Sequence, residues 1–220
     1  MTLGKLTDLQ VRILRDLAVV RPRWTLTGGG ALAGLHTKHR STRDLDLFWR
    51  GAGQLGELPR DVTRLLESDH LEVDPVQITP AFCRLRVTGG GETVLVDLVA
   101  DAAPVVEEPR ETAFQDVSIL VDTRHEILVS KLCSLLERSE LRDLEDLRVL
   151  LEGGGDLERA VSEAPSKDAG FSPLTLVWLL RDLPISSVAS ASGWAPEEII
   201  RLEKFRDELV RTILGLTIQQ

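Results

Sequence analysis

Residues 24–49 have the sequence WTLTGGGALAGLHTKHRSTRDLDLFW, which contains the strongest structural signal in the chain. The pattern predicts a short strand over 24–27, a glycine turn over 28–30, a helical turn or two over 31–36, a basic connector over 37–43 and a second strand over 44–49. Glycines between a strand and a helix let a phosphate approach the backbone N–H groups at the start of the helix. The first half of the stretch therefore predicts a phosphate-binding turn.

The second predicted strand carries two aspartates. Asp44 and Asp46 are two residues apart, so their carboxylates leave the same face of the strand while Leu45 and Leu47 point into the core. Mg²⁺ prefers one or two carboxylates plus phosphate oxygens to a site made by the protein alone. The pair beside the glycine turn therefore predicts a magnesium site that handles a nucleoside triphosphate.

These motifs, taken together, resemble those of a known superfamily. The superfamily is that of nucleotidyltransferases with the polymerase-β catalytic fold, and within it the AbiEii/MenT group, the toxins of bacterial toxin–antitoxin and abortive-infection systems. The resemblance covers roughly residues 24–150. It is carried first by Gly28-Gly29-x-Ala31-Leu32 and by Arg40-x-Thr42-x-Asp44-x-Asp46.

The resemblance implies an α+β protein with a polymerase-β-like mixed sheet flanked by helices. We expect a nucleotidyltransferase catalytic domain over 1–122, and a helical domain over 123–220 that completes the active-site cleft. Asp44 and Asp46 are expected to hold Mg²⁺ and to serve catalysis. The expected nucleotide-binding residues are Gly28, Gly29, Arg40 and Thr42.

A third acidic residue is expected on a neighbouring strand. Residues 93–99 read TVLVDLV, an apolar strand interrupted by Asp97, and a buried carboxylate is costly unless it is paired or binds a cation. The resemblance implies that Asp97 is the third catalytic and metal-binding acid. Asp101, just past the strand, is a competing candidate. The alternative for Asp97 is an aspartate on an edge strand that faces water.

A lysine within an apolar run is the next unusual feature. Lys131 lies in ILVSKLCSLL, where its ammonium needs a partner. The resemblance continues here through Lys131, Arg138, Arg142, Asp143 and Asp146, and implies that Lys131 and Asp143 are active-site residues, with Lys131 also binding the nucleotide. The alternative is a lysine that reaches solvent beside a surface pair of acids.

Charge and composition limit the classes of partner. The chain has 220 residues, a formal net charge of −9 and a pI near 5.0, which argues against broad coating of nucleic acid. Residues 156–220 hold 10 acidic residues against 7 Lys and Arg, which argues against sequence-specific DNA binding. A local basic patch beside the predicted site suits a polyanion, although a solvated connector would have the same composition. Its members are His36, Lys38, His39, Arg40 and Arg43.

Localisation follows from cysteine usage and hydropathy. Cys83 and Cys133 both lie in apolar surroundings, as buried thiols do in a reducing cytosol. The first ten residues contain no apolar signal core, and no run approaches the roughly 20 apolar residues of a membrane span. We therefore expect a cytoplasmic protein.

The resulting functional hypothesis is Mg²⁺-dependent transfer of NMP from an NTP to an acceptor, with release of pyrophosphate. By resemblance the acceptor is the 3′ end of a tRNA, and the chain is the toxin of a system with a separately encoded antitoxin. Two alternatives remain open. One is a nucleotidyltransferase that modifies a small molecule, as aminoglycoside-inactivating enzymes do. The other is a degenerate, non-catalytic binding module.

Overall fold

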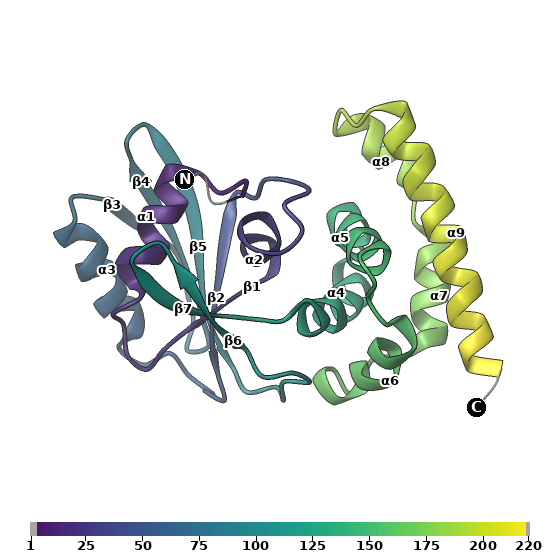
Figure 1. Ribbon diagram of the computed structural model, residues 1–220, viewed down its shortest axis with the longest axis horizontal. Helices are drawn as coiled ribbons and strands as arrows, with labels where there is room; N and C mark the ends of the chain where they lie inside the picture. The colour runs from purple at the N-terminus through teal and green to yellow at the C-terminus, as the bar shows by residue number, and fades with distance from the viewer. Residues whose placement is uncertain (1–3, 219–220) are drawn as a thin grey trace. The chain divides into compact units, whose positions relative to one another are not determined.

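Residues 4–218 are described by a computed structural model (Figure 1). The chain divides into two units, Met1–Thr123 and Arg124–Gln220. Within residues 4–218, all strands belong to the first unit and most helices to the second, so the protein is of the α+β class.

A mixed seven-stranded sheet forms the centre of the first unit, with strand order β3-β4-β5-β2-β1-β7-β6. β1 is parallel to β7 and β2 is parallel to β5, and the other neighbouring pairs are antiparallel. The strands are β1 (Thr25–Thr27), β2 (Asp44–Arg50), β3 (Glu72–Ile78), β4 (Phe82–Gly89), β5 (Glu92–Asp101), β6 (Arg110–Phe114) and β7 (Val117–Val121). Because β5 lies inside the sheet, Asp97 is not on an edge strand, and the water-facing alternative is wrong.

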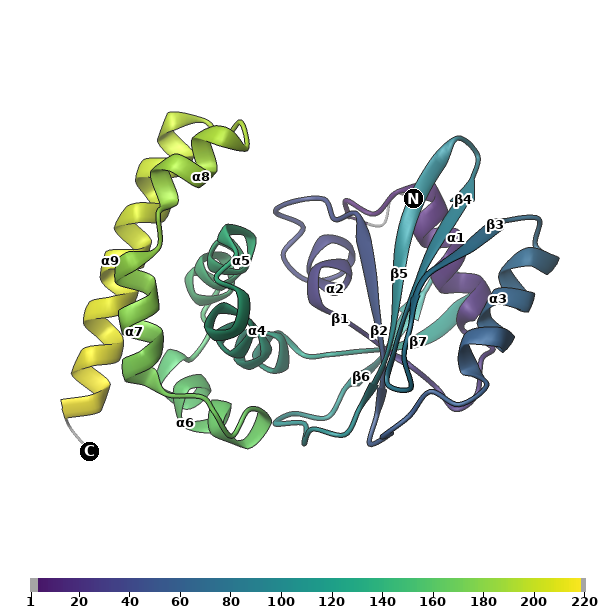
Figure 2. The same cartoon turned by 180° about the vertical axis from the view of Figure 1, so that it is seen from behind.

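Three helices accompany this sheet: α1 (Asp8–Leu17), α2 (Gly28–Gly34) and α3 (Leu58–Ser68). α1 contacts β5 and α3, while α3 contacts β3, so both helices cover the same face (Figure 2). The side chains of β2 that point to the core alternate with its aspartates, and Leu45, Leu47 and Trp49 are all buried. The core thus fixes which face of β2 presents Asp44 and Asp46.

Two sequence-based boundaries are corrected by the structure. Helix α2 begins at Gly28, so the three glycines form the first turn of the helix itself and do not precede it. The Pro- and Glu-containing sequence of residues 102–116 predicts a connector, but residues 110–114 within it form strand β6. β6 is the edge strand next to β7 and has mostly exposed or half-exposed side chains, so its sequence lacks the apolar alternation of a strand with one buried face.

The second unit consists of helices throughout its described part. They are α4 (Arg124–Arg138), α5 (Leu141–Glu152), α6 (Leu157–Lys167), α7 (Pro173–Asp182), α8 (Ile185–Ala191) and α9 (Pro196–Ile218). α4 packs against α5 and α6, and the long helix α9 packs against α7 and α8. The apolar side chains of α4 and α5 at helical spacing are buried between these elements.

No single helix within residues 4–218 is long and apolar enough to cross a membrane. Helices α7 and α8 reach that length and composition only as a pair, with a bend of 61° between them.

Candidate active site

The glycine turn and the aspartates of β2 meet in the first unit. Gly28 has a φ of +56°, a conformation that L side chains rarely adopt, and a Cβ built on it would collide with Oδ2 of Asp46. Thr27, the residue before it, is the register partner of Asp46 across the antiparallel β1–β2 pair. Strand pairing therefore places the first glycine of the turn directly beside the carboxylate.

Residues of the basic connector lie beside the second glycine of this turn. A Cβ on Gly29 would lie 2.8 Å from Oγ1 of Thr42 and 3.5 Å from Nη2 of Arg40. Thr42 is buried, its hydroxyl donates a hydrogen bond to Oδ1 of Asp44, and its carbonyl accepts one from Gln10 Nε2 at 3.0 Å. Six residues that were singled out from the sequence thus lie close together in the first unit: Gly28, Gly29, Arg40, Thr42, Asp44 and Asp46.

Asp97 is adjacent to this group. It is the register partner of Asp46 on the parallel pair β2–β5, and only 5% of its surface is exposed. Its two carboxylate oxygens are both taken by Arg84 of β4, with Nε to Oδ1 at 2.7 Å and Nη2 to Oδ2 at 2.6 Å. The sequence did not single out Arg84. The sequence feature that could have identified it is the alternation of polar and apolar residues in FCRLRV, which puts Arg84 and Arg86 on the polar face of the strand.

Asp101 occupies a different position. It lies four residues beyond Asp97 on β5, opposite Arg50 of β2, and Arg50 forms ion pairs with both Asp101 and the fully buried Asp122. The other carboxylate oxygen of Asp101 accepts a hydrogen bond from the backbone N–H of Ala103 at 3.0 Å. Of the two candidates for the third acid, Asp97 is therefore the one that lies next to Asp46.

The donors present decide whether a divalent cation fits here. Among residues 4–218, no group of three or more His, Cys, Asp or Glu side chains is arranged to hold a metal ion. Asp44 and Asp46 are half-buried carboxylates on one face, and the absence of a side chain on Gly28 lets Asp46 lie directly against the start of α2. Two carboxylates completed by phosphate oxygens match the preference of Mg²⁺. The residues therefore fit a metal that binds together with a triphosphate.

Lys131 and Asp143 lie together in the second unit. Lys131 Nζ is 2.5 Å from Asp143 Oδ1 and 2.8 Å from Asp146 Oδ2, and all three side chains are buried. Arg138 donates two further hydrogen bonds to Asp143, at 2.8 and 3.1 Å. The alternative of a solvent-reaching lysine beside surface acids therefore does not describe these residues.

The charges in this cluster support one another. Burial alone would lower the pKa of Lys131, but Asp146 and Asp143 outweigh it and raise the pKa above its ordinary value. Burial alone would raise the pKa of Asp143, but Arg138 and Lys131 outweigh it and lower the pKa. Both groups are consequently held in their charged forms.

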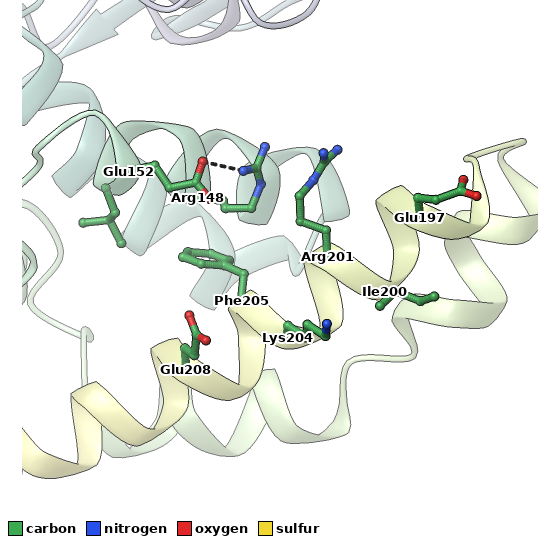
Figure 3. A pocket seen from close by; sticks show the side chains of 9 residues that line it. Arg148, Glu152, Glu197, Ile200, Arg201, Lys204, Phe205 and Glu208 are labelled. Atoms are coloured by element: carbon green, nitrogen blue, oxygen red, sulfur yellow. Dashed lines mark hydrogen bonds and ion pairs between the residues drawn. The ribbon is translucent and has the colours of Figure 1, made fainter.

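A groove of about 600 Å³ lies along α5 and α9 in the second unit (Figure 3). Its charged lining balances, because three basic and three acidic residues line it: Arg148, Arg201, Lys204, Glu152, Glu197 and Glu208. Arg148 is also engaged by Glu145 and Glu152, at 2.7 and 2.6 Å. None of the residues singled out from the sequence lines this groove, and its balanced charge does not select an anionic ligand.

Comparison with known proteins identifies a family and structures of similar fold. The model of the family described as "Nucleotidyl transferase AbiEii toxin, Type IV TA system" matches residues 12–214. JHP933 from Helicobacter pylori has a similar structure, with a TM-score of 0.55, 17% identity and 97% of each chain covered. The antibiotic-resistance factor ANT(2'')-Ia has a TM-score of 0.50 and 15% identity, over 73% of this chain and 92% of its own. These two likenesses concern the fold alone. No curated protein matches the chain.

Proposed function

The chain belongs to the AbiEii family of nucleotidyl transferase toxins, and from that membership we propose that it transfers NMP from an NTP to the 3′ end of a tRNA. It is a nucleotidyltransferase, and the transfer of a nucleotidyl group is the activity common to that class. The finer proposal has three parts: the NTP is bound with Mg²⁺, the acceptor is RNA, and an antitoxin protein restrains the enzyme. We propose the cytoplasm as the place of the reaction, since NTPs and tRNA are found there.

One observation carries the proposal, namely the contact of the glycine turn with the aspartates of β2. Because Gly28 and Gly29 lack side chains, Asp46 and Thr42 lie directly against the backbone at the start of α2, whose N–H groups would bind the phosphates. Arg40 lies near Gly29 and would offset the negative charge of the phosphates. Thr42 hydrogen-bonds to Asp44 and thereby orients its carboxylate.

Asp44 and Asp46 would hold Mg²⁺ together with the phosphate oxygens. When bound, Mg²⁺ supplies neutralisation of the charge that develops on the triphosphate. The acceptor hydroxyl attacks the α-phosphorus, the bond from that phosphorus to the bridging oxygen of the β-phosphate breaks, and pyrophosphate leaves. Asp97, adjacent to Asp46, would complete the cluster of carboxylates or accept the proton of the hydroxyl.

Lys131 and Asp143 enter the proposal as a pair. We propose that the ammonium of Lys131 serves the nucleotide phosphates and that Asp143 orients it, because Asp143 already holds that ammonium at 2.5 Å. Arg138 and Asp146 would support the pair through the contacts they make with it.

A small hydroxylated molecule is the second candidate acceptor. The observation that favours it is the formal net charge of −9, which opposes the approach of a long polyanion such as tRNA. The basic residues near the glycine turn favour RNA, since they offer an anion a local positive field.

The acceptor can be tested with the purified protein, Mg²⁺, each α-labelled NTP in turn and total tRNA. Native tRNA is compared with tRNA whose 3′-terminal diol has been oxidised by periodate. We expect label in native tRNA and none in oxidised tRNA. Equal labelling of both would exclude the 3′ end, and label only in added aminoglycosides would favour the small-molecule acceptor.

A further inference from the structure

Arg84 is the ion-pair partner of Asp97, the third carboxylate of the proposed site, and the pair is bidentate. The guanidinium meets both oxygens of Asp97 side by side, an arrangement that is stronger and more directional than a single contact. The Asp97 side chain is 7% exposed, whereas that of Arg84 is 36% exposed. The carboxylate is thus fixed in the sheet, and the arginine lies at the border with solvent.

The two aspartates of β2 also affect the pKa of Arg84. The hydrogen bonds to Asp97 raise the pKa of Arg84, burial opposes this, and the charges of Asp97, Asp44 and Asp46 add to the increase. The register explains this reach, because Arg84, Asp97 and Asp46 are consecutive partners across β4, β5 and β2. One guanidinium therefore balances part of the charge of three carboxylates.

A divalent cation at this site would also need the carboxylate oxygens of Asp97. A metal can use the second lone pair of each carboxylate oxygen, but there it lies beside the guanidinium, and the two positive charges repel each other. Three carboxylates on adjoining strands repel one another unless a positive charge lies among them. Either the guanidinium of Arg84 or a divalent cation supplies that positive charge.

We propose that Arg84 is a positioning residue that holds both oxygens of Asp97, and that Arg84 and a divalent cation compete for that carboxylate. The inference rests on the proposed function, in which Asp44 and Asp46 hold the metal. Arg84 orients the carboxylate of Asp97 through its two hydrogen bonds until the cation arrives with the nucleotide. The guanidinium, released at the solvent border, is then available to the anionic substrate.

Arg86 offers a matched control on the same strand. It lies two residues from Arg84 on the same face of β4, is exposed, and is the register partner of Leu95, an uncharged residue. Its removal takes the same charge from the same face and leaves the Arg84–Asp97 pair intact.

The test is a titration with Mn²⁺ alone, in which free Mn²⁺ is followed by electron paramagnetic resonance, on the full chain and its variants. We expect Arg84→Met to bind Mn²⁺ at least about ten-fold more tightly than wild type, the smallest factor for a close charge pair. Arg84→Lys keeps the charge but cannot hold both oxygens, so we expect about three-fold tighter binding. Arg86→Met should bind as wild type does.

Arg84→Lys alone decides the test if Arg84→Met does not fold. Unchanged Mn²⁺ affinity in the folded Arg84 variants, or an equal gain in Arg86→Met, would overturn the inference. Transfer of label by wild type, measured separately, reports on the proposed function. A wild type that transfers label while its Arg84 variants bind Mn²⁺ no more tightly would leave the proposed function standing and remove only the role of Arg84.

Discussion

Asp46 on β2 and Asp97 on β5 are direct register partners on two parallel strands, and their side chains leave the same face of the sheet. They are 51 residues apart in the sequence, so only the pairing of β2 with β5 brings them together. Asp101 shares the strand and the face with Asp97, but it lies opposite Arg50. The two candidates for the third acid can therefore be separated by experiment.

We expect Asp97→Asn to lower the rate of nucleotidyl transfer by at least about 100-fold, the usual loss when a charge-stabilising group is removed. Asp101→Asn should retain transfer within a few-fold, because Asp101 pairs with Arg50 and not with the aspartates of β2. Initial rates at saturating NTP check this, with thermal unfolding as the control for folding. A larger loss in Asp101→Asn would reverse the assignment.

Gly28→Ala is expected to be harmful for two reasons. The new methyl group would meet Asp46, and a φ of +56° costs an L residue about 1–2 kcal/mol. We expect the free energy of unfolding to fall by about that amount and transfer to fall with it. Gly53→Ala is the control, since a Cβ there meets nothing within 4 Å, and urea unfolding should show a change within about 0.5 kcal/mol. Equal effects of the two substitutions would contradict the proposed contact.

Lys131→Met should destabilise the protein by about 3–5 kcal/mol, because it leaves the carboxylates of Asp143 and Asp146 buried without the ammonium. Urea unfolding measures the loss. Lys204→Met replaces an exposed lysine of α9 and should change stability by less than about 0.5 kcal/mol. A loss below about 1 kcal/mol in Lys131→Met would show that the cluster does not stabilise the helical unit.

The same cluster predicts a pH dependence. The folded pKa of Asp143 is lowered, so its contribution is present above its ordinary pKa of 3.8 and is lost as the pH falls through the folded value. The folded pKa of Lys131 is raised, so its contribution is present below 10.5 and is lost as the pH rises through the folded value. The stability difference between wild type and Lys131→Met should therefore be constant from about pH 5 to 9 and shrink below pH 3.8. A difference that grows on acidification would contradict this sign.

Local patterns predicted much of the site. The alternation of residues 44–49 is enough to put Asp44 and Asp46 on one face, and the glycines mark the junction of β1 with α2, although they belong to the helix itself. Lys131 was conspicuous because an ammonium in an apolar helical run requires a partner. Asp143 lies in the first turn of the next helix, and Asp146 lies three residues further on. Each of these signals depends on neighbours in the sequence.

Features set by pairing across the sheet could not be predicted in the same way. The contact of Arg84 with Asp97 depends on the register of β4 and β5, and that of Arg50 with Asp122 joins residues 72 positions apart. A shift of one residue in register would turn Arg84 to the other face. Strand β6 was missed because it buries only one of its five side chains, Phe114.

The most direct test of the proposed site compares wild type with Asp46→Asn in the transfer of label from NTP to tRNA with Mg²⁺. Asp74→Asn, an exposed aspartate of β3, is the matched control. We expect wild type and Asp74→Asn to label tRNA equally, and Asp46→Asn, folded as judged by thermal unfolding, to lose at least about 99% of the activity. Full transfer by folded Asp46→Asn would contradict the assignment of the metal site to the aspartates of β2.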